Sequence, residues 1–226
     1  MKYVLNEFTT KPLPDVAPRT LELPTTARKV VTLVGIRRTG KTYLLYQTMR
    51  RLLAEGVDRR RILYLNFEDD RLLPIRTDEL DLILRGHEEL YPDVTNGKKY
   101  LFFDEVQNVP SWETYIRRLH DTENAHIFVT GSSSHLMSRE LATGLRGRSV
   151  SYEVFPLSFG EFLAFRGVAY EPYSRASESR VAASMEDYLR TGGLPEVVLA
   201  DESLRQRILK ERSATGSRKT TYNSSR

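Results

Sequence analysis

Short apolar runs alternate along this chain with longer stretches in which apolar residues recur at helical spacing. Apolar runs of strand length lie at residues 29–35, 61–69, 98–106 and 125–132. Helical periodicity lies between them at residues 42–56, 78–90 and 111–122. Apolar strands that are separated by helices are typical of a parallel sheet with helices on both faces.

A further strand and a helical segment follow these elements. Residues 132–148 predict a helix and a loop, and residues 149–157 predict a fifth strand. Residues 158–167 and 181–193 then predict two helices that come after the sheet. Residues 213–226 contain no aliphatic side chain larger than alanine, so they predict a disordered end.

The pattern divides the chain into four parts within an α/β fold. Residues 1–27 carry four prolines and predict a lead-in along the surface, with a short helix near Leu5. Residues 28–157 predict a three-layer αβα core that holds a mainly parallel, five-stranded sheet. Residues 158–212 predict a small helical segment, and residues 213–226 a disordered basic tail.

The composition fits one main domain without a membrane-spanning segment. At 226 residues and 40% hydrophobic content, the chain is long enough for one substantial core. It contains no run of about 18 apolar residues and does not begin with the apolar segment of a secretory leader, so we expect a cytoplasmic protein. The absence of cysteine excludes disulfides and thiolate metal sites.

The positive net charge comes from the last part of the chain. The whole sequence carries a net +4, whereas residues 203–226 hold seven basic residues and one acidic residue, a net +6 that leaves −2 for the rest. Such a tail can bind nucleic acid by neutralising phosphates, or it can be a solvated end that binds nothing. Both interpretations, and therefore DNA as a partner, stay open.

The junction between the first strand and the first long helix carries a phosphate-binding motif. The pattern G-x-x-x-x-G-K-T is formed there by Gly35, Gly40, Lys41 and Thr42. The glycines allow successive amide N–H groups to face one anion, and the helix N-terminus adds the positive end of its dipole. Lys41 would reach the β- and γ-phosphates of a nucleotide, and the Thr42 hydroxyl would coordinate Mg²⁺. The alternative is a glycine-containing turn with a chance lysine.

The residues before Gly40 are further candidates for nucleotide contact. Arg37, Arg38 and Thr39 lie inside the same loop. Under the phosphate-binding hypothesis, the two arginines contact the nucleotide or a neighbouring subunit, and Thr39 belongs to the cradle around the phosphates. Under the alternative, both arginines are simply exposed to solvent.

Two consecutive carboxylates end the third predicted strand. Asp104 follows the apolar residues of that strand, where a carboxylate can help to hold the Mg²⁺ that Thr42 also contacts. Glu105 comes next and can take a proton from an attacking water, which is the additional group that a hydrolase needs. Acidic pairs also occur at solvated strand ends, but the upstream loop favours nucleotide hydrolysis over that reading.

Polar residues end the fourth predicted strand. Thr130 and Ser132 lie at the carboxyl edge of the sheet, where ligands of parallel sheets usually bind, so either can orient a water or contact the γ-phosphate. Capping of the next helix is the alternative, and it is at least as good an explanation for Ser133 and Ser134.

A glycine-rich loop before the fifth strand offers two arginines. Arg146 and Arg148 lie within the segment GLRGR. An arginine that is supplied across a subunit boundary can stabilise the transition state of phosphoryl transfer, which would make a second copy of the chain a partner. Arginines in loops are also common surface residues, so both interpretations stay open at this point.

Six segments of the sequence resemble the prokaryotic AAA-type ATPase family. The resemblance is to the branch, common in archaea, that joins a P-loop domain to a C-terminal domain of unknown function related to restriction-type nucleases. It runs from near Lys11 to about Glu211, and it is carried by GIRRTGKTYLLYQ, ILYLNFEDDRL, YLFFDEVQNVPSWE, FVTGSSSHLMSRE, LRGRSVSYEVFPLSFGEFL and YLRTGGLPEVV.

This resemblance implies a function as well as a fold. It implies a sheet of the additional-strand ATPase type, a metal-binding role for Asp104 and a catalytic role for Glu105. It also implies a polar sensor segment at residues 130–132 and a catalytic arginine at Arg148, preceded by Gly147. The expected activity is Mg²⁺-dependent ATP hydrolysis, with ATP and ADP as ligands. A nucleotide-dependent switch with slow turnover and a DNA-associated ATP-binding module are the alternatives.

The sequence departs from the family pattern at its end. Relatives in this branch continue after ILKE with an apolar and acidic helix, whereas here polar residues RSATGSRKTTYNSSR follow. This departure predicts a truncated or frame-shifted C-terminal domain. Any nucleic-acid activity of that domain would then be absent from this chain.

Overall fold

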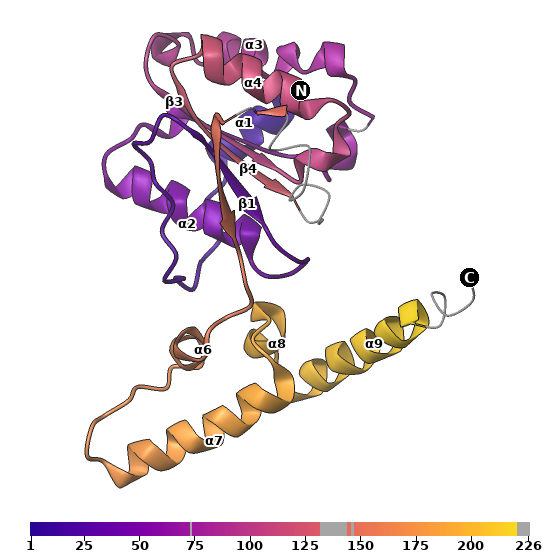
Figure 1. The fold of residues 1–226 in the computed structure, drawn as a ribbon. Helices are drawn as coiled ribbons and strands as arrows, with labels where there is room; N and C mark the ends of the chain where they lie inside the picture. The colour runs from indigo at the N-terminus through magenta and orange to yellow at the C-terminus, as the bar shows by residue number, and fades with distance from the viewer. Residues whose placement is uncertain (73, 132–143, 146, 221–226) are drawn as a thin grey trace. The chain divides into compact units, whose positions relative to one another are not determined.

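The computed structural model describes residues 1–72, 74–131, 144–145 and 147–220, without the side chains of residues 77 and 212–220. These residues form two compact units, Met1–Val154 and Phe155–Arg226. The first unit holds the sheet and the second holds helices, as Figure 1 shows.

The first unit is built on one parallel sheet. The strands, in chain order, are β1 (Val30–Val34), β2 (Ile62–Asn66), β3 (Lys99–Asp104), β4 (Ala125–Gly131) and β5 (Ser149–Glu153). They lie in the order β2-β3-β4-β1-β5, and all four neighbouring pairs are parallel. The prediction of a five-stranded parallel sheet is therefore confirmed. Insertion of β4 between β1 and β3 also confirms the additional-strand arrangement.

Helices cover both faces of this sheet. They are α1 (Lys2–Thr10), α2 (Lys41–Ala54), α3 (Asp81–Leu90) and α4 (Trp112–Thr122), with short 3₁₀ turns at Arg59–Arg61, Asp70–Leu72, Thr77–Glu79, Pro92–Val94 and Val106–Asn108. Figure 1 shows α3 and α4 together on one face and α2 on the other. Parallel strands need such cover because both of their faces are apolar.

Alternation along β3 explains why its last residue faces α2. Tyr100 and Phe102 pack with the buried residues of α2, whereas Leu101 and Phe103 pack on the face covered by α3 and α4. Because side chains alternate between the faces of a strand, Asp104 continues the set that faces α2. The hydrophobic core thus directs a carboxylate toward the helix that follows the glycine loop.

The lead-in runs beside α2 after a short N-terminal helix. α1 confirms the helix expected near Leu5, and the Leu5 side chain is buried in the core. Gln47 of α2 then exchanges hydrogen bonds with the main chain of Arg19, at 2.7 and 3.0 Å. Arg50 of α2 donates to the carbonyl oxygens of Leu13 and Pro14. These contacts fix the polar lead-in along the surface of the helix.

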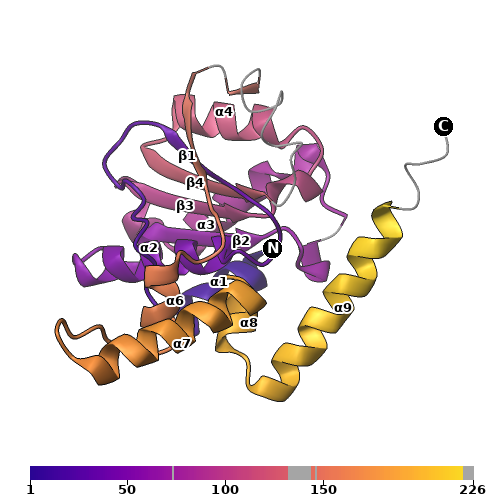
Figure 2. The same ribbon diagram turned by 60° about the horizontal axis from the view of Figure 1, so that its bottom comes forward.

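The second unit contains more helix than the sequence predicts. Its described helices are α6 (Phe159–Phe165), α7 (Arg175–Thr191), α8 (Pro195–Leu199) and α9 (Glu202–Thr220), of which α7 and α9 are the long ones (Figure 2). A capping box formed by Ser158 and Glu161 begins α6. The sequence predicts disorder from residue 213, whereas the backbone of α9 stays helical to Thr220. The reason is that the helix-forming residues 202–212 begin a helix, which polar side chains can continue. Residues 221–226 lie outside the description.

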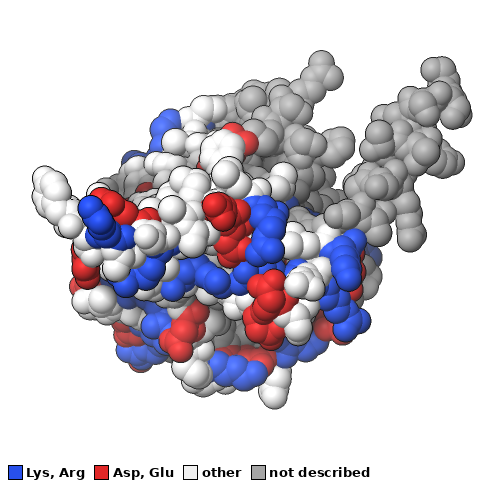
Figure 3. Space-filling model, turned by 90° about the horizontal axis from the view of Figure 1, so that it is seen from below, with Lys and Arg blue, Asp and Glu red and all other residues white. Residues whose placement is uncertain are grey.

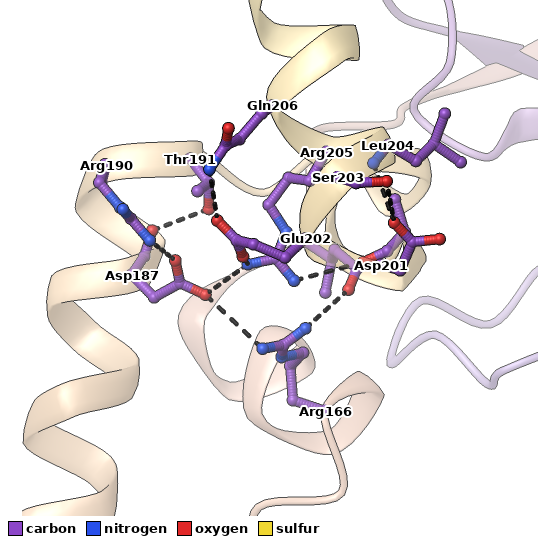
Figure 4. A network of polar contacts seen from close by, with 12 residues as sticks. Arg166, Asp187, Arg190, Thr191, Asp201, Glu202, Ser203, Leu204, Arg205 and Gln206 are labelled. Atoms are coloured by element: carbon purple, nitrogen blue, oxygen red, sulfur yellow. Dashed lines mark hydrogen bonds and ion pairs between the residues drawn. The ribbon is translucent and has the colours of Figure 1, made fainter.

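An ion-pair network joins the helices of the second unit (Figure 4). Asp187 of α7 accepts hydrogen bonds from Arg205 of α9 at 3.1 Å and from Arg190 at 2.9 Å. Arg166, which follows α6, has Nη2 at 3.8 Å from the same carboxylate. Since only 4% of Arg205 is exposed, removal of Asp187 would leave a buried cation with the exposed Glu202, at 3.3 Å, as its remaining carboxylate partner among the described residues.

A close backbone contact in the same unit joins the segment before α6 to the turn between α7 and α8. The amide of Leu157 donates to the carbonyl oxygen of Gly193 over 2.6 Å, and the Tyr188 hydroxyl donates to the Leu157 carbonyl oxygen over 2.9 Å. A Cβ atom at Gly193 would lie 2.3 Å from that oxygen. Only glycine therefore fits here without movement of the backbone.

Candidate functional site

The loop between β1 and α2 contains two glycines with positive φ angles. Gly35 has φ +152°, and a Cβ atom there would lie 2.4 Å from the carbonyl oxygen of Val154. Gly40 has φ +90° and is the N-cap residue of α2. Both glycines thus occupy conformations that other residues rarely adopt. The loop ends at a helix N-terminus, which is a favourable place for an anion.

Lys41 is the first residue of α2, and its side chain reaches back to this loop. Only 5% of the residue is exposed, and Nζ donates to the carbonyl oxygens of Gly35 and Ile36, both at 3.1 Å. Burial lowers the pKa of Lys41, and the nearby charges of Glu105 and Asp104 act in the opposite direction. The structure therefore places a buried cation at the centre of the loop, held by main-chain oxygens that a phosphate can replace as its partner.

Asp104 is the fully buried acceptor of three hydroxyl groups. Oδ2 accepts from the Thr42 hydroxyl at 2.8 Å and from the Tyr64 hydroxyl at 3.1 Å. Oδ1 accepts from the Thr130 hydroxyl. Burial raises the pKa of Asp104, and the hydrogen bonds from the three hydroxyls oppose that change. Thr42 and Asp104, which the sequence predicts as ligands of one Mg²⁺, thus lie within hydrogen-bond distance of each other.

Glu105 follows immediately in an uncommon backbone conformation. Its φ of +53° is in the left-handed region, which few residues other than glycine adopt. Its amide donates to the Thr130 hydroxyl oxygen over 3.0 Å, and its carboxylate accepts a hydrogen bond from Gln107 at 2.5 Å. Such strain is concentrated at functional sites, where the surrounding contacts maintain it.

Thr130 lies at the carboxyl end of β4, as the sequence predicts. Only 1% of the residue is exposed, and its hydroxyl is engaged with Asp104 and with the amide of Glu105. The structure therefore connects Thr130 to the carboxylate pair, and contact with a nucleotide stays a prediction. Ser132 and Arg146 lie outside the described residues.

The remaining loop residues point in different directions. Arg37 is exposed and has Nη2 at 3.5 Å from Oε1 of Glu68. Arg38 is exposed with φ +69°. Thr39 is buried, its hydroxyl donates to the loop carbonyl of residue 36, and its own carbonyl accepts from Arg19 at 2.9 Å. Thr39 thus stabilises the loop, whereas both arginines remain accessible to a ligand.

Within one chain, Arg148 lies away from the glycine loop, at the opposite end of β1. Its carbonyl oxygen accepts from the amide of Val30, so it lies at the amino end of β1, whereas Gly35 follows the carboxyl end. Its Nε donates to Asp121 over 2.8 Å. Arg148, with His120, lowers the pKa of Asp121 to about 2. A role for Arg148 in phosphate chemistry would therefore concern another copy of the chain.

Sequence reasoning missed two residues that the structure adds to the site. Tyr64 donates to Asp104 from β2, and Arg19 donates to the main chain of the glycine loop from the lead-in. The apolar alternation of β2 places Tyr64 on one face, but only the pairing of Asn66 with Asp104 shows that this face meets the carboxylate. No local pattern indicates the contact of Arg19, because it joins residues far apart in the sequence.

The oxygen atoms of Asp104 and Thr42 fit a magnesium ion that also binds phosphate and water better than a metal ion that is bound by protein side chains alone. Within the ranges that the structure describes, no group of three or more His, Cys, Asp and Glu residues could hold a metal. Mg²⁺ usually binds through one or two protein oxygens together with phosphates and water. The carboxylate of Asp104 and the hydroxyl of Thr42 are suitable hard oxygen ligands, next to a loop shaped for phosphate.

Comparison with known proteins decides the family. A family model described as AAA domain matches residues 27–163, which include the glycine loop, both carboxylates and β5. The chain belongs to the AAA domain family. Within this family, the loop and its helix identify the first unit as a P-loop nucleotide-binding domain. No helix among residues with a described structure is long and apolar enough to cross a membrane.

This AAA domain has longer relatives. The uncharacterized protein MJ1544 of Methanocaldococcus jannaschii is 38% identical over 198 residues, which are 87% of this chain and 42% of the relative. An uncharacterized protein of Haemophilus influenzae is 38% identical over 178 residues, 77% of this chain and 42% of that protein. The chain thus spans about two fifths of the length of these curated relatives.

Solved structures show more distant likenesses to the AAA domain. The Thermotoga maritima RuvB Holliday junction branch migration motor aligns with a TM-score of 0.48 and 17% identity, over 83% of this chain and 56% of that chain. The Aeropyrum pernix ORC1 protein in complex with DNA aligns with a TM-score of 0.43 and 15% identity, over 70% of this chain and 50% of that chain. Identities this low transfer no function.

Proposed function

We propose that this AAA domain binds ATP with Mg²⁺ and hydrolyses it to ADP and phosphate. The observation that carries the proposal is the hydrogen bond from Thr42 to Asp104, because it joins the phosphate-binding loop to the carboxylate pair at the end of β3. A cytoplasmic location is part of the same proposal, since the sequence contains no cysteine.

The loop and Lys41 bind the phosphates in this mechanism. The amides from Gly35 to Gly40 and the N-terminus of α2 stabilise negative charge on the β- and γ-phosphates. Lys41 gives up its two carbonyl partners for phosphate oxygens, which is favourable because a buried ammonium gains an anionic partner. This exchange makes binding specific for a ligand with adjacent phosphates.

Thr42 and Asp104 would hold Mg²⁺, and Glu105 acts on the attacking water. The ion would supply positive charge that offsets the negative charge of the phosphates. Glu105 accepts a proton from water on a carboxylate oxygen, while the oxygen of that water attacks the γ-phosphorus. The bond from the γ-phosphorus to the oxygen that bridges it to the β-phosphate breaks, and ADP leaves with that oxygen and its electron pair. The amide contact with Thr130 fixes the main chain of Glu105 during this step.

Arg148 would stabilise the γ-phosphate of a neighbouring copy. Its position at the opposite end of β1 from the glycine loop supports action between chains rather than within one. Turnover per chain should then rise with protein concentration. A nucleotide switch without rapid turnover is the alternative, and it predicts tight binding of ATP at every concentration with little phosphate release.

Phosphate release measured over a hundredfold range of protein concentration tests the proposal. The variants are Lys41→Ala, Glu105→Gln and Arg148→Ala, and Glu178→Gln on the exposed surface of α7 is the matched control for loss of a carboxylate. Turnover that needs Mg²⁺, falls by about a hundredfold or more in the first two variants and persists in the control would support the mechanism. Equal turnover in Glu105→Gln and the wild type would exclude Glu105 as the base.

The face of the molecule in Figure 3 gives no separate support to DNA binding. Figure 3 shows Lys and Arg interspersed with Asp and Glu on the face that it presents. Several arginines of the first unit are paired with carboxylates, including Arg50 with Asp15 and Arg51 with Glu22. Phosphate backbones bind best to continuous basic surfaces. Addition of DNA to the phosphate-release assay tests this alternative directly.

A further inference from the structure

Tyr64 makes a contact with Asp104 that neither the family motif nor the proposed reaction accounts for. Its hydroxyl donates to Oδ2 over 3.1 Å, beside the 2.8 Å hydrogen bond from Thr42 to the same oxygen. Tyr64 comes from β2, which pairs with β3 in parallel, with Asn66 opposite Asp104. The tyrosine thus reaches the carboxylate from the neighbouring strand.

We propose that Tyr64 is a positioning residue that fixes the Asp104 carboxylate in the orientation that binds Mg²⁺. This inference rests on the proposed function, because it assigns Tyr64 a part in the same metal site. A carboxylate offers about four acceptor positions on its two oxygens. The hydroxyls of Thr42, Tyr64 and Thr130 fill three of them, so one position remains for the ion or for a water bound to it.

The Tyr64 ring is held firmly enough for this role. Phe8 of α1 lies against it, with the two ring centroids 5.4 Å apart. The ring centroid of Tyr46 in α2 lies 5.3 Å from that of Tyr64. The Tyr46 hydroxyl also donates to the Tyr64 oxygen at 3.2 Å. Arg59 in turn lies over the Phe8 ring at 5.1 Å. The phenol is therefore confined between two helices before any metal binds.

The loss of this donor has a specific expected consequence. Partners that orient metal ligands typically change metal affinity by about 10- to 100-fold when they are removed. Phenylalanine at position 64 keeps the ring contacts and removes only the hydroxyl. Asp104 would then keep two hydroxyl donors and could rotate about its side-chain bonds. We therefore expect weaker Mg²⁺ binding with no change in the binding of nucleotide alone.

Titration of a fluorescent ADP analogue with and without Mg²⁺ tests the inference. Tyr64→Phe is compared with the wild type and with Tyr115→Phe. Tyr115 is a suitable control because its buried hydroxyl has no hydrogen-bond partner among the residues described, and it lies on the face covered by α3 and α4. The measured quantities are the Mg²⁺ concentration at half-maximal enhancement of analogue binding and the affinity without Mg²⁺.

Each outcome decides the matter. The inference holds if Tyr64→Phe raises the half-maximal Mg²⁺ concentration by about tenfold, keeps Mg²⁺-free affinity within about twofold, and Tyr115→Phe changes neither. It is overturned if Tyr64→Phe leaves the Mg²⁺ requirement unchanged, or weakens binding equally with and without Mg²⁺. A wild type that binds no nucleotide, or binds it without any effect of Mg²⁺, contradicts the proposed function itself.

Discussion

The amide of Glu105 donates a hydrogen bond to the hydroxyl oxygen of Thr130 over 3.0 Å, across the boundary between β3 and β4. The same hydroxyl donates to Asp104, so one side chain fixes both the carboxylate of residue 104 and the main chain of residue 105. β4 can supply it only because this strand lies next to β3. Strand order is thus what assembles the carboxylate pair.

Thr130→Val should uncouple this arrangement while preserving side-chain shape. The partly buried amide of Glu105 loses its acceptor, which should lower the free energy of unfolding by about 1–3 kcal/mol. Turnover should fall by about tenfold or more because Glu105 and Asp104 lose a common support. Denaturant unfolding and phosphate release measure the two effects. Thr48→Val is the control, since the buried Thr48 hydroxyl bonds only within α2, and near-wild-type turnover is expected there.

Lys41→Met should stabilise the nucleotide-free protein. Burial lowers the pKa of Lys41, which means that the folded state disfavours its charge. Replacement by a side chain of similar length removes that cost, so the thermal midpoint should rise by roughly 2–4 °C, and its increase on addition of ATP should disappear.

Lys99→Met provides the opposite case. Lys99 is equally buried, and although burial lowers its pKa, hydrogen bonds from Lys99 to Glu88 at 2.8 Å and to Glu123 at 3.2 Å raise it overall. Its loss leaves two carboxylates without their partner, so the thermal midpoint should fall. If the thermal midpoint changes equally in Lys41→Met and Lys99→Met, the buried charge of Lys41 does not destabilise the nucleotide-free protein.

His87 should make stability depend on pH below neutrality. Burial, with a contribution from Lys99, lowers the pKa of His87 from its ordinary value of 6.5. The unfolded chain therefore binds the proton more readily than the folded protein does. The contribution of neutral His87 is fully present above about pH 6.5 and is lost as pH falls through that value toward the folded-state pKa.

Thermal unfolding from about pH 7.5 to about pH 5.5 measures this effect. The slope from one such group is at most about 1.4 kcal/mol per pH unit. His87→Phe should flatten the profile, because phenylalanine can occupy the position beside the Tyr91 ring without a titrating group. A slope that is the same in the variant and the wild type would assign the pH dependence to other groups.

Gly193→Ala should destabilise the helical unit. The new Cβ atom would lie 2.3 Å from the carbonyl oxygen of Leu157, so the backbone must move at a cost of about 1–3 kcal/mol. Gly160→Ala is the matched control within α6, where a Cβ atom meets nothing within 4 Å, and it should be neutral or stabilising by up to about 1 kcal/mol. Urea unfolding of both variants tests the difference, which should vanish if the Leu157 contact is absent in solution.

The sequence carried the information for the sheet and for the main site residues. Alternation of apolar strands with helices was sufficient for the parallel sheet, because burial of both strand faces leaves a clear pattern. The motif at Gly35 to Thr42 located the loop, since positive φ values require glycine where the chain bends closely past Val154. Asp104 followed from its place at the end of a fully buried strand.

Other features depend on distant contacts and were not predictable in this way. Tyr64 resembles an ordinary strand residue until the register of β2 against β3 is known. The sequence pattern does not predict the first turns of α7, because they are polar and carry no apolar stripe. The start of the helix is set by the N-cap residue Ser174. Arg148 was placed in a loop correctly, but only the pairing of β5 with β1 shows which edge of the sheet it occupies.

The N-terminal helix also affects how this protein behaves at high concentration. Leu5 belongs to the core on one face of the sheet and Phe8 packs with the core on the other, so α1 lies along β2, one of the two edge strands. An uncovered edge strand offers its free N–H and C=O groups to strands of other molecules. α1 therefore protects this edge against pairing with other molecules, and a chain that starts after residue 11 should lose solubility before it loses its fold.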